Sequence, residues 1–141
     1  MTNEATLIVE TEPPINFTCD NSTGIEKGTI LKLSDPMTAA ASDGDNDLVA
    51  GIAAEEKIES DGKTKIAVYR GGIFKVTASG SVAVGDPLGT DGAANNYVAS
   101  NIADANLSGA KQIGIALEAA SDDETFLMEL RPNAENGGVT A

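Results

Sequence analysis

The chain has 141 residues, of which 41% are hydrophobic and only 4% aromatic, and it contains no Trp. This length and apolar content predict one compact domain with a core of Val, Ile, Leu and Ala. The formal net charge is −13, from 22 acidic and 9 basic side chains, which excludes the positive surface that binding to nucleic acid or to an anionic membrane requires. No apolar stretch approaches the length of a membrane span and no secretion signal is evident, so we expect synthesis in a cytoplasm.

Residues 1–23 differ in character from the rest of the chain and predict an extended N-terminal arm. A β-prone apolar run at 5–11 is followed by Pro13 and Pro14, which stiffen the backbone and exclude both a helix and a central strand. Alone, this run cannot bury enough apolar surface to offset the entropy of ordering it. We therefore expect it to add a strand to another molecule. The alternative is that it forms the first strand of the chain's own barrel.

Residues 24–132 form a β-rich body, which we predict to be a small β-barrel or sandwich in an all-β fold. Apolar and polar residues alternate at 27–33, as they do in a half-buried strand. They alternate again at 63–80, where Gly71 and Gly72 hinge two strands. These segments supply the framework of the predicted domain.

Turn signals and irregular segments separate the predicted strands. Asp-Gly pairs within 60–62 and 90–96 indicate turns, because both residues tolerate a positive φ. The helical signal is confined to a weak turn at 101–112, and residues 133–141 lack periodicity and predict a flexible tail.

The body contains an internal repeat of two similar units. Each copy reads as a glycine turn, a strand, a variable loop, a Gly-Ile-Ala strand, an acidic turn and a strand that ends in Arg. The corresponding positions lie at similar but unequal separations, which indicates loops of different length. These pairs are Gly28 and Gly85, Gly51 and Gly114, Glu55 and Glu118, and Arg70 and Arg131. Two such units predict approximate internal symmetry.

The residue types exclude most catalytic chemistry. The chain has no His, so pairs of a nucleophile with His, and metal sites that use His, are excluded. Cys19 is the single cysteine and stands in a polar stretch without a partner. Residues 42–48 resemble the start of an EF-hand loop, but Leu48 and Ala54 occupy the positions that require Gly and Glu. We expect a solvated acidic loop there, with a weak nonspecific cation site as the alternative, and we expect no enzyme activity, no cofactor and no dedicated metal site.

The order of the strand motifs resembles the capsid-cement, or head-decoration, family of tailed bacteriophages over residues 24–132. Each motif is common in β domains, and the resemblance depends on their joint order. The motifs are KGTILKL at 27–33, VAGIAAEEKI at 49–58, VYRGGIFKV at 68–76, VAVGDPL at 82–88 and IGIALEAASDDETFLMEL at 113–130.

The resemblance implies a structural protein of the virion, made in the host cytoplasm, that binds the major capsid protein on the outside of the assembled shell. It implies a homotrimer that stabilises the shell, without a catalytic site. On this basis the apolar residues of the arm are candidates for contact with the capsid or with a neighbouring subunit. They are Leu7, Ile8, Val9, Ile15 and Phe17.

Two rival functions are open. A carbohydrate-binding or adhesin-like β module would stack sugars on aromatic rings, for which the chain offers Tyr69 and Tyr97 but no Trp. A trimeric nucleotide-hydrolysing β protein would need basic residues gathered around phosphate, whereas the nine basic residues here are scattered.

Overall fold

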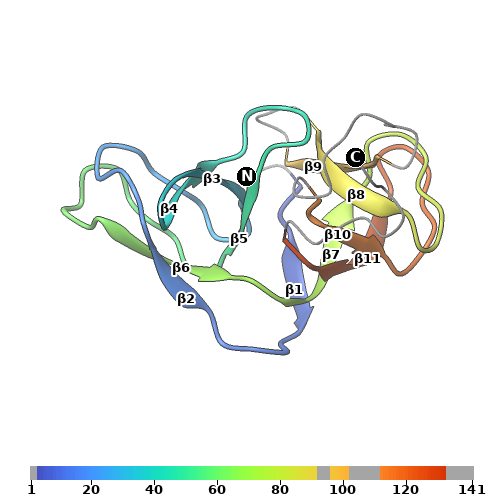
Figure 1. Ribbon diagram of the computed structural model, residues 1–141, viewed down its shortest axis with the longest axis horizontal. Helices are drawn as coiled ribbons and strands as arrows, with labels where there is room; N and C mark the ends of the chain where they lie inside the picture. Colours follow the sequence, from blue (N-terminus) through green and yellow to red (C-terminus); the bar gives the residue numbers. More distant parts are fainter. Residues whose placement is uncertain (1–2, 92–95, 102–111, 133–141) are drawn as a thin grey trace.

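The computed structural model describes residues 3–91, 96–101 and 112–132, and every regular element in these ranges is a β-strand. The strands are β1 Thr6–Val9, β2 Ile15–Thr18, β3 Ile30–Asp35, β4 Thr38–Ala41, β5 Val49–Ala53, β6 Lys65–Tyr69, β7 Gly72–Thr77, β8 Pro87–Asp91, β9 Tyr97–Ser100, β10 Gly114–Ala116 and β11 Thr125–Leu130. They form two lobes side by side, a closed barrel of β2 to β6 and a six-stranded sheet of β1 and β7 to β11 (Figure 1). The predicted all-β fold with a small barrel is confirmed. The tail expected at 133–141, and nearly all of the turn expected at 101–112, lie outside the described residues.

The barrel has the strand order β2-β4-β3-β5-β6, and a parallel pairing of Thr18 with Thr38 closes it. Along each strand, side chains point alternately to the inside and the outside of the barrel. In β6, Ile66 and Val68 are fully buried while Lys65 is exposed. The other buried residues that fill the barrel are Phe17, Cys19, Ile25, Leu31, Ala39, Ala50 and Ala53.

The second lobe is a curled sheet with the order β1-β7-β11-β10-β8-β9. β7 and β11 pair over six residues, and from β11 the side chains of Phe126, Met128 and Leu130 turn into the core. A parallel bridge between Ala78 and Val98 brings the end of β7 beside β9, so the sheet curls back on itself. The sheet is therefore almost closed into a second barrel.

Five strands of each lobe pair in the same order. The order is β2-β6-β5-β3-β4 in the barrel and β7-β11-β10-β8-β9 in the sheet. Local hydrogen bonds recur as well: Gly28 N donates to Ala53 O at 2.9 Å, and Gly85 N donates to Ala116 O at 2.8 Å. Below we call residues at the same place in this pattern counterparts. Tyr69 lies opposite Ile52 as Glu129 lies opposite Ile115, so the predicted match of Arg70 with Arg131 is wrong by one residue.

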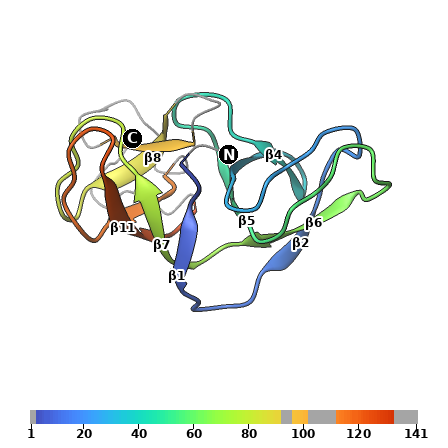
Figure 2. The ribbon, with the colours of Figure 1, turned by 180° about the vertical axis from the view of Figure 1, so that it is seen from behind.

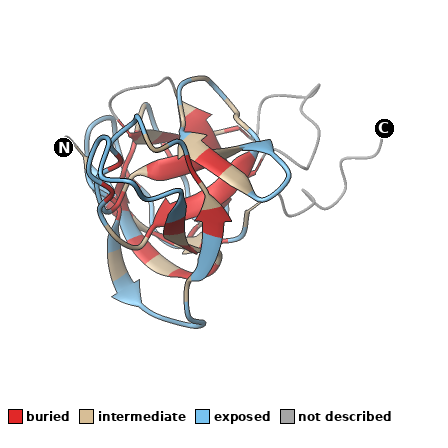
Figure 3. Cartoon of the chain, turned by 90° about the vertical axis from the view of Figure 1, so that its left-hand side faces the viewer, coloured by how far each residue is buried: buried red, intermediate tan, exposed pale blue. Residues whose placement is uncertain are grey.

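The two lobes share one apolar core. Ile30, Val49 and Ile52 project from the outside of the barrel into the core of the sheet lobe. The ring of Tyr69 meets that of Phe74 edge-on, with 5.6 Å between the centroids. Buried residues lie along the strand centres and exposed ones in the loops (Figure 3). The lobes are therefore joined by packing as well as by the chain.

Asn96 adds hydrogen bonds to the contact between the lobes. Its side-chain oxygen accepts the backbone N–H of Ile30 at 2.8 Å, and its side-chain nitrogen donates to the carbonyls of Gly28 and Asn3 at 2.9 and 3.0 Å. Because Asn96 is only 8% exposed, these bonds are shielded from water. They fix the position of β3 against the sheet lobe.

The expectation of a separate N-terminal arm is wrong. β1 pairs with β7 along the edge of the sheet (Figure 2), and β2 pairs with β6 in the barrel. Ala5 and Phe17 are buried, so the body begins well before residue 24. Pro13 and Pro14 lie in the connection between β1 and β2, where no ladder hydrogen bond is lost. The run at 5–11 is a strand of the chain's own fold, in the sheet and not in the barrel.

Candidate interaction surface

The structure separates the five predicted contact residues into two groups. Phe17 is 3% exposed inside the barrel, and Leu7 is half-buried against the shared core. Phe17 therefore belongs to the barrel core, which corrects the expectation that it faces a partner, whereas Leu7 packs on the shared core and keeps part of its surface exposed. Ile8, Val9 and Ile15 are 50%, 45% and 46% exposed. These three stay predicted contact residues.

β1 is the outermost strand on its side of the six-stranded sheet. Its register against β7 shifts between Leu7 and Val9, which places a bulge at Ile8. A bulge in a four-residue edge strand limits the pairing of further strands. Ile8 and Val9 are thus presented to a partner as apolar side chains beside a short, irregular backbone edge.

The outside of the sheet lobe carries a row of residues in cross-strand register. Ile73 lies opposite Glu129, Glu129 opposite Ile115, and Ile115 opposite Pro87. We call these four residues the outer row. Ile73, Glu129 and Ile115 are partly exposed, because they alternate with core residues along their strands. Glu129 is the charged member of the row and pairs with Arg131 at 3.2 Å.

The barrel has the counterpart of this row, and there it is covered. Ile30 lies opposite Ile52, and Ile52 opposite Tyr69; we call these three residues the inner row. Ile30 and Ile52 are 1% and 0% exposed, because the sheet lobe lies against them. The same face is thus a buried contact in the first unit and partly open in the second.

The outer row was not among the residues predicted from the sequence. Ile73 and Ile115 look like ordinary members of alternating strands, and alternation does not reveal which outer face a neighbour covers. The available signal was the repeat itself, because Gly114-Ile115-Ala116 matches Gly51-Ile52-Ala53.

The turns at the far end of the sheet lobe combine exposed apolar side chains with carboxylates. Val84 is 68% exposed and Leu117 39%. Each nearby carboxylate accepts a local hydrogen bond, so these acids stabilise the turns. The bonds are Ala83 N to Asp86, Leu127 N to Glu118, Gly80 N to Asp122, the Tyr97 hydroxyl to Asp123, and Ser121 N to Glu124.

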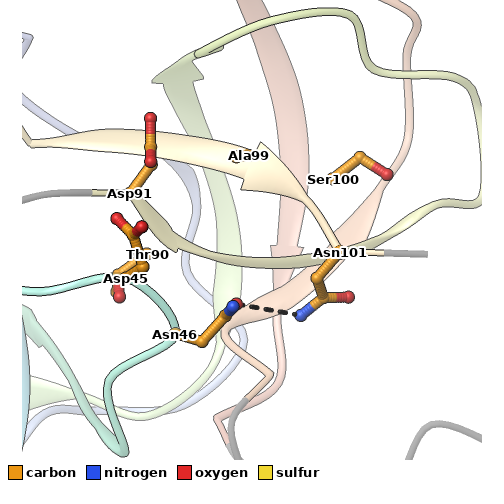
Figure 4. A pocket seen from close by; sticks show the side chains of 7 residues that line it. All are labelled: Asp45, Asn46, Thr90, Asp91, Ala99, Ser100 and Asn101. Carbon is orange, nitrogen blue, oxygen red and sulfur yellow. Dashed lines mark hydrogen bonds between the residues drawn. The ribbon is translucent and has the colours of Figure 1, made fainter. Parts of the chain in front are cut away.

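A polar hollow of about 440 Å³ lies where a barrel loop meets β8 and β9. Asn101 donates a long hydrogen bond of 3.4 Å to Asn46 within it (Figure 4). The residues that line it are Asp45, Asn46, Thr90, Asp91, Ala99, Ser100 and Asn101. In the ranges that the structure describes, no three His, Cys, Asp or Glu residues are grouped to hold a metal ion.

The acidic loop at 42–48 belongs to the barrel and forms a hydrogen bond with the sheet lobe. The carboxylate of Asp47 accepts the hydroxyl of Ser42 at 2.9 Å and the backbone N–H groups of Asp43 and Gly44 at 3.0 and 3.1 Å. The backbone N–H of Asp47 donates to the hydroxyl of Thr90 at 2.8 Å. These bonds explain Asp47 by local structure, and Asp43 forms an ion pair with Lys32 at 2.7 Å.

The titratable groups of the barrel interior are also engaged in the fold. Cys19 is 3% exposed, and burial raises the pKa of its thiol. The side chain of Lys57 is 1% exposed, and its ammonium donates to Asn21 O at 2.8 Å, to Ile58 O at 3.0 Å and to the Asp61 carboxylate at 3.2 Å. The sequence showed no sign of this buried lysine. Within the described residues, no helix has the length and apolar character needed to cross a bilayer.

Comparison with known proteins places this geometry in a family. Phage cement proteins match residues 9–131, and no curated protein matches the chain. The crystal structure of the head fiber gp8.5 N base in bacteriophage phi29 is similar with a TM-score of 0.54 and 16% identity, over 87% of this chain and 99% of that one. At this identity the structural likeness shows the fold alone. Because the family match runs from the end of β1 to just beyond β11, the chain belongs to the family of phage cement proteins.

Proposed function

We propose that this protein binds the outer surface of an assembled phage capsid through the major capsid protein, as a homotrimer, and stabilises the shell. Membership of the phage cement family assigns it to the structural proteins associated with a phage capsid, and this is the observation that carries the proposal. We further propose that it has no catalytic activity. It would be made in the host cytoplasm and would act on the outside of the virion.

The surface of the molecule supports a binding role. Large apolar side chains stand exposed on β1, where Ile8 and Val9 are about half accessible. Scattered exposed apolar residues are ordinary, but here two are adjacent on a sheet edge that contains a bulge. We assign the capsid contact to this edge, with Ile8 as its central side chain.

Capsid attachment is tested with shells that lack the protein. Purified protein is mixed with the shells, and the bound fraction is measured by co-sedimentation together with the temperature at which the shells open. We expect saturable binding and a higher opening temperature. Shells that bind no protein, or that open at the same temperature with it bound, would contradict the proposal.

The contact residue is tested by Ile8→Asp, which places a charge on an exposed position without touching the core. Ile58→Asp is the matched control, because Ile58 is 63% exposed on a distant barrel turn. We expect Ile8→Asp to weaken shell binding at least tenfold and Ile58→Asp to leave it unchanged. Equal binding by both variants would remove β1 from the contact.

The carbohydrate-binding alternative is tested directly by the binding of purified protein to immobilised glycans. Both tyrosines make contacts within the fold: Tyr69 meets Phe74 edge-on, and the hydroxyl of Tyr97 bonds to Asp123. The observed contacts therefore do not favour a sugar-stacking platform. Saturable glycan binding without shell binding would decide for the alternative.

A further inference from the structure

We propose that copies of this chain associate head to tail, with the outer row of one copy packed on the open face of the barrel of the next. The receiving surface consists of Ile15 and Met37. This inference rests on the homotrimer in the proposed function and specifies the two surfaces that join its subunits. It is argued from the contact that already joins the two lobes within one chain.

The internal contact has two halves. The inner row of the barrel, Ile30, Ile52 and Tyr69, forms one half. Phe74 and Asn96 of the sheet lobe form the other, through the edge-on contact of Tyr69 with Phe74 and the hydrogen bond from Ile30 N to Asn96. Each half has a counterpart in the other lobe. The counterpart of the inner row is partly exposed at Glu129 and Ile115 and buried at Pro87, and the counterpart of the other half, Ile15 and Met37, is exposed.

The outer row is the counterpart of the inner row. Ile115 corresponds to Ile52 within the two Gly-Ile-Ala strands, and Pro87 lies opposite Ile115 as Ile30 lies opposite Ile52. Glu129 takes the place of Tyr69, and Ile73 extends the row by one further strand. The outer row therefore offers Ile115 and Ile73 as partly exposed apolar side chains for a partner to cover.

The receiving pair has its own counterparts. Ile15 lies opposite Val68 in the barrel, at the place where Phe74 lies opposite Met128 in the sheet. Met37 directly precedes β4, as Asn96 directly precedes β9. These last two residues share a positive φ, 50° for Met37 and 61° for Asn96.

Both members of the open receiving pair are exposed apolar residues. Ile15 is 46% and Met37 52% exposed, whereas Phe74 and Asn96 are 1% and 8% exposed. Apolar surface of this kind gains free energy when a partner removes it from water. The barrel thus presents an uncovered version of the surface that receives the inner row inside the molecule.

The two counterpart surfaces match each other in polarity. In the internal contact, the N–H of Ile30 donates to Asn96. In the two counterpart surfaces, the place of Ile30 is taken by Pro87, which is buried and has no N–H to donate. The place of Asn96 is taken by Met37, which has no amide oxygen to accept a hydrogen bond. Donor and acceptor are absent together, so packing the outer row on the receiving pair leaves no buried polar group unpaired at this point.

A contact between two different surfaces of the same chain is heterologous, and it closes into a ring when the rotation between copies allows it. A ring of three copies satisfies every outer row and every receiving pair. Because each copy carries a net charge of −13, like charges oppose association over long distances, and added salt screens them. Association should therefore strengthen as salt is raised.

The test uses two variants that block opposite halves. Ile115→Asp places a carboxylate in the outer row, and Met37→Asp places one in the receiving pair, where Asp also tolerates the positive φ. Val84→Asp is the matched control, because Val84 is 68% exposed and lies in neither surface. Circular dichroism and thermal unfolding establish first that each variant is folded.

Sedimentation velocity then measures assembly of each protein alone and of the two blocked variants mixed in equal amounts. We expect the unmodified chain and Val84→Asp to assemble as concentration and salt rise, and each blocked variant alone to stay monomeric. The mixture should form a heterodimer, because one intact outer row then meets one intact receiving pair.

Three outcomes would overturn the inference: an unmodified chain that stays monomeric at every concentration, a mixture that stays monomeric while the unmodified chain assembles, or blocked variants that assemble normally. Shell binding is measured separately on the same proteins. An unmodified chain that assembles but does not bind shells would count against capsid binding only. Blocked variants that still form homotrimers on the shell would count against the head-to-tail contact only, and shell-bound isolated monomers of the unmodified chain would count against both the homotrimer and the contact.

Discussion

Asp61 shows how a single residue secures the end of the barrel. It accepts the backbone N–H of Lys63 at 2.9 Å, that of Ile58 at 3.3 Å and the ammonium of Lys57 at 3.2 Å. The position of Lys57 is taken by Ala120 in the sheet lobe, where the matching bridge pairs Val82 with Ala120. The barrel has a buried ammonium group at this position, which the carboxylate of Asp61 neutralises, whereas the sheet lobe has an alanine and no such charge.

The first prediction is the pH dependence of stability. The hydrogen bond from Lys63 N–H, and after it the contact with Lys57, lowers the pKa of Asp61 below its ordinary value of 3.8. A carboxyl with a lowered pKa stabilises the folded state above its unfolded pKa, and this contribution is lost as the pH falls through the lowered pKa. We expect Asp61→Asn to lower the denaturant midpoint at neutral pH, and the difference from the unmodified chain to shrink as the pH falls below 3.8.

Glu59→Gln is the matched control for this prediction, since it removes one negative charge from the same turn. We expect it to leave the midpoint nearly unchanged. An equal loss in both variants would show that overall charge, and not the hydrogen bonds of Asp61, sets the effect.

At the scale of the element, strand predictions were confirmed where apolar and polar residues alternate along the whole segment. The segment at 63–80 became β6 and β7, with the chain passing from one lobe to the other at Gly71 and Gly72. β5 is buried at all five positions and shows no alternation, so only its match with the second Gly-Ile-Ala strand marked it. Alternation of apolar and polar residues identifies a strand with one exposed face, but it cannot identify a strand that is buried on both faces.

The wrong prediction of a separate N-terminal arm and the missed outer row also have a physical cause. β1 is four residues long and pairs with β7, which lies more than sixty residues away along the chain. No local pattern encodes such a pairing, and Pro13 and Pro14 made the run look detached. Alternation along the strands does not show which of the two rows a second lobe covers, because that coverage is a property of tertiary structure.

Glycine at the start of β10 is required by close packing of the backbone. A Cβ at Gly114 would lie 2.2 Å from the carbonyl oxygen of Glu129, and one at its counterpart Gly51 would lie 2.1 Å from that of Tyr69. Both contacts are far shorter than van der Waals distance, and neither backbone oxygen can rotate away. We expect Gly114→Ala to destabilise the protein by more than about 2 kcal/mol in denaturant unfolding.

Gly62→Ala separates steric clash from backbone preference. A Cβ at Gly62 meets no atom within 4 Å, although its φ is +88°. We therefore expect only the cost of the left-handed conformation, about 1–2 kcal/mol. A cost at Gly114 no larger than that at Gly62 would mean that β10 and β11 move apart easily.

Removal of β1 should destabilise the fold. Deleting residues 1–9 takes Ala5 and Leu7 from the shared core and leaves the edge of β7 unpaired. We expect a clear fall in melting temperature and concentration-dependent aggregation, because an uncovered strand edge recruits other strands. Thermal unfolding and light scattering measure both effects. An unchanged melting temperature would show that β1 is not needed for stability.

At the scale of the whole molecule, the two lobes should unfold as one cooperative unit. One core cluster contains residues of both lobes, among them Ile30 and Ile52 from the barrel and Phe126 from the sheet. Neither lobe can lose its structure without exposing apolar surface of the other. A single transition, coincident by far-ultraviolet circular dichroism and by tyrosine fluorescence, is the expected behaviour.

Asn96 tests how strongly the lobes are coupled. Asn96→Gly removes the amide without straining the backbone, because Gly adopts a φ of 61° readily. The buried N–H of Ile30 then loses its acceptor, and we expect a loss of about 1–3 kcal/mol. Met37→Gly is the matched control, since Met37 has a φ of 50° and is exposed, and it should cost clearly less. Because apolar packing across the contact persists, the transition of Asn96→Gly should stay single. Two separated transitions would show that this hydrogen-bonded contact, and not the shared core, makes the lobes one folding unit.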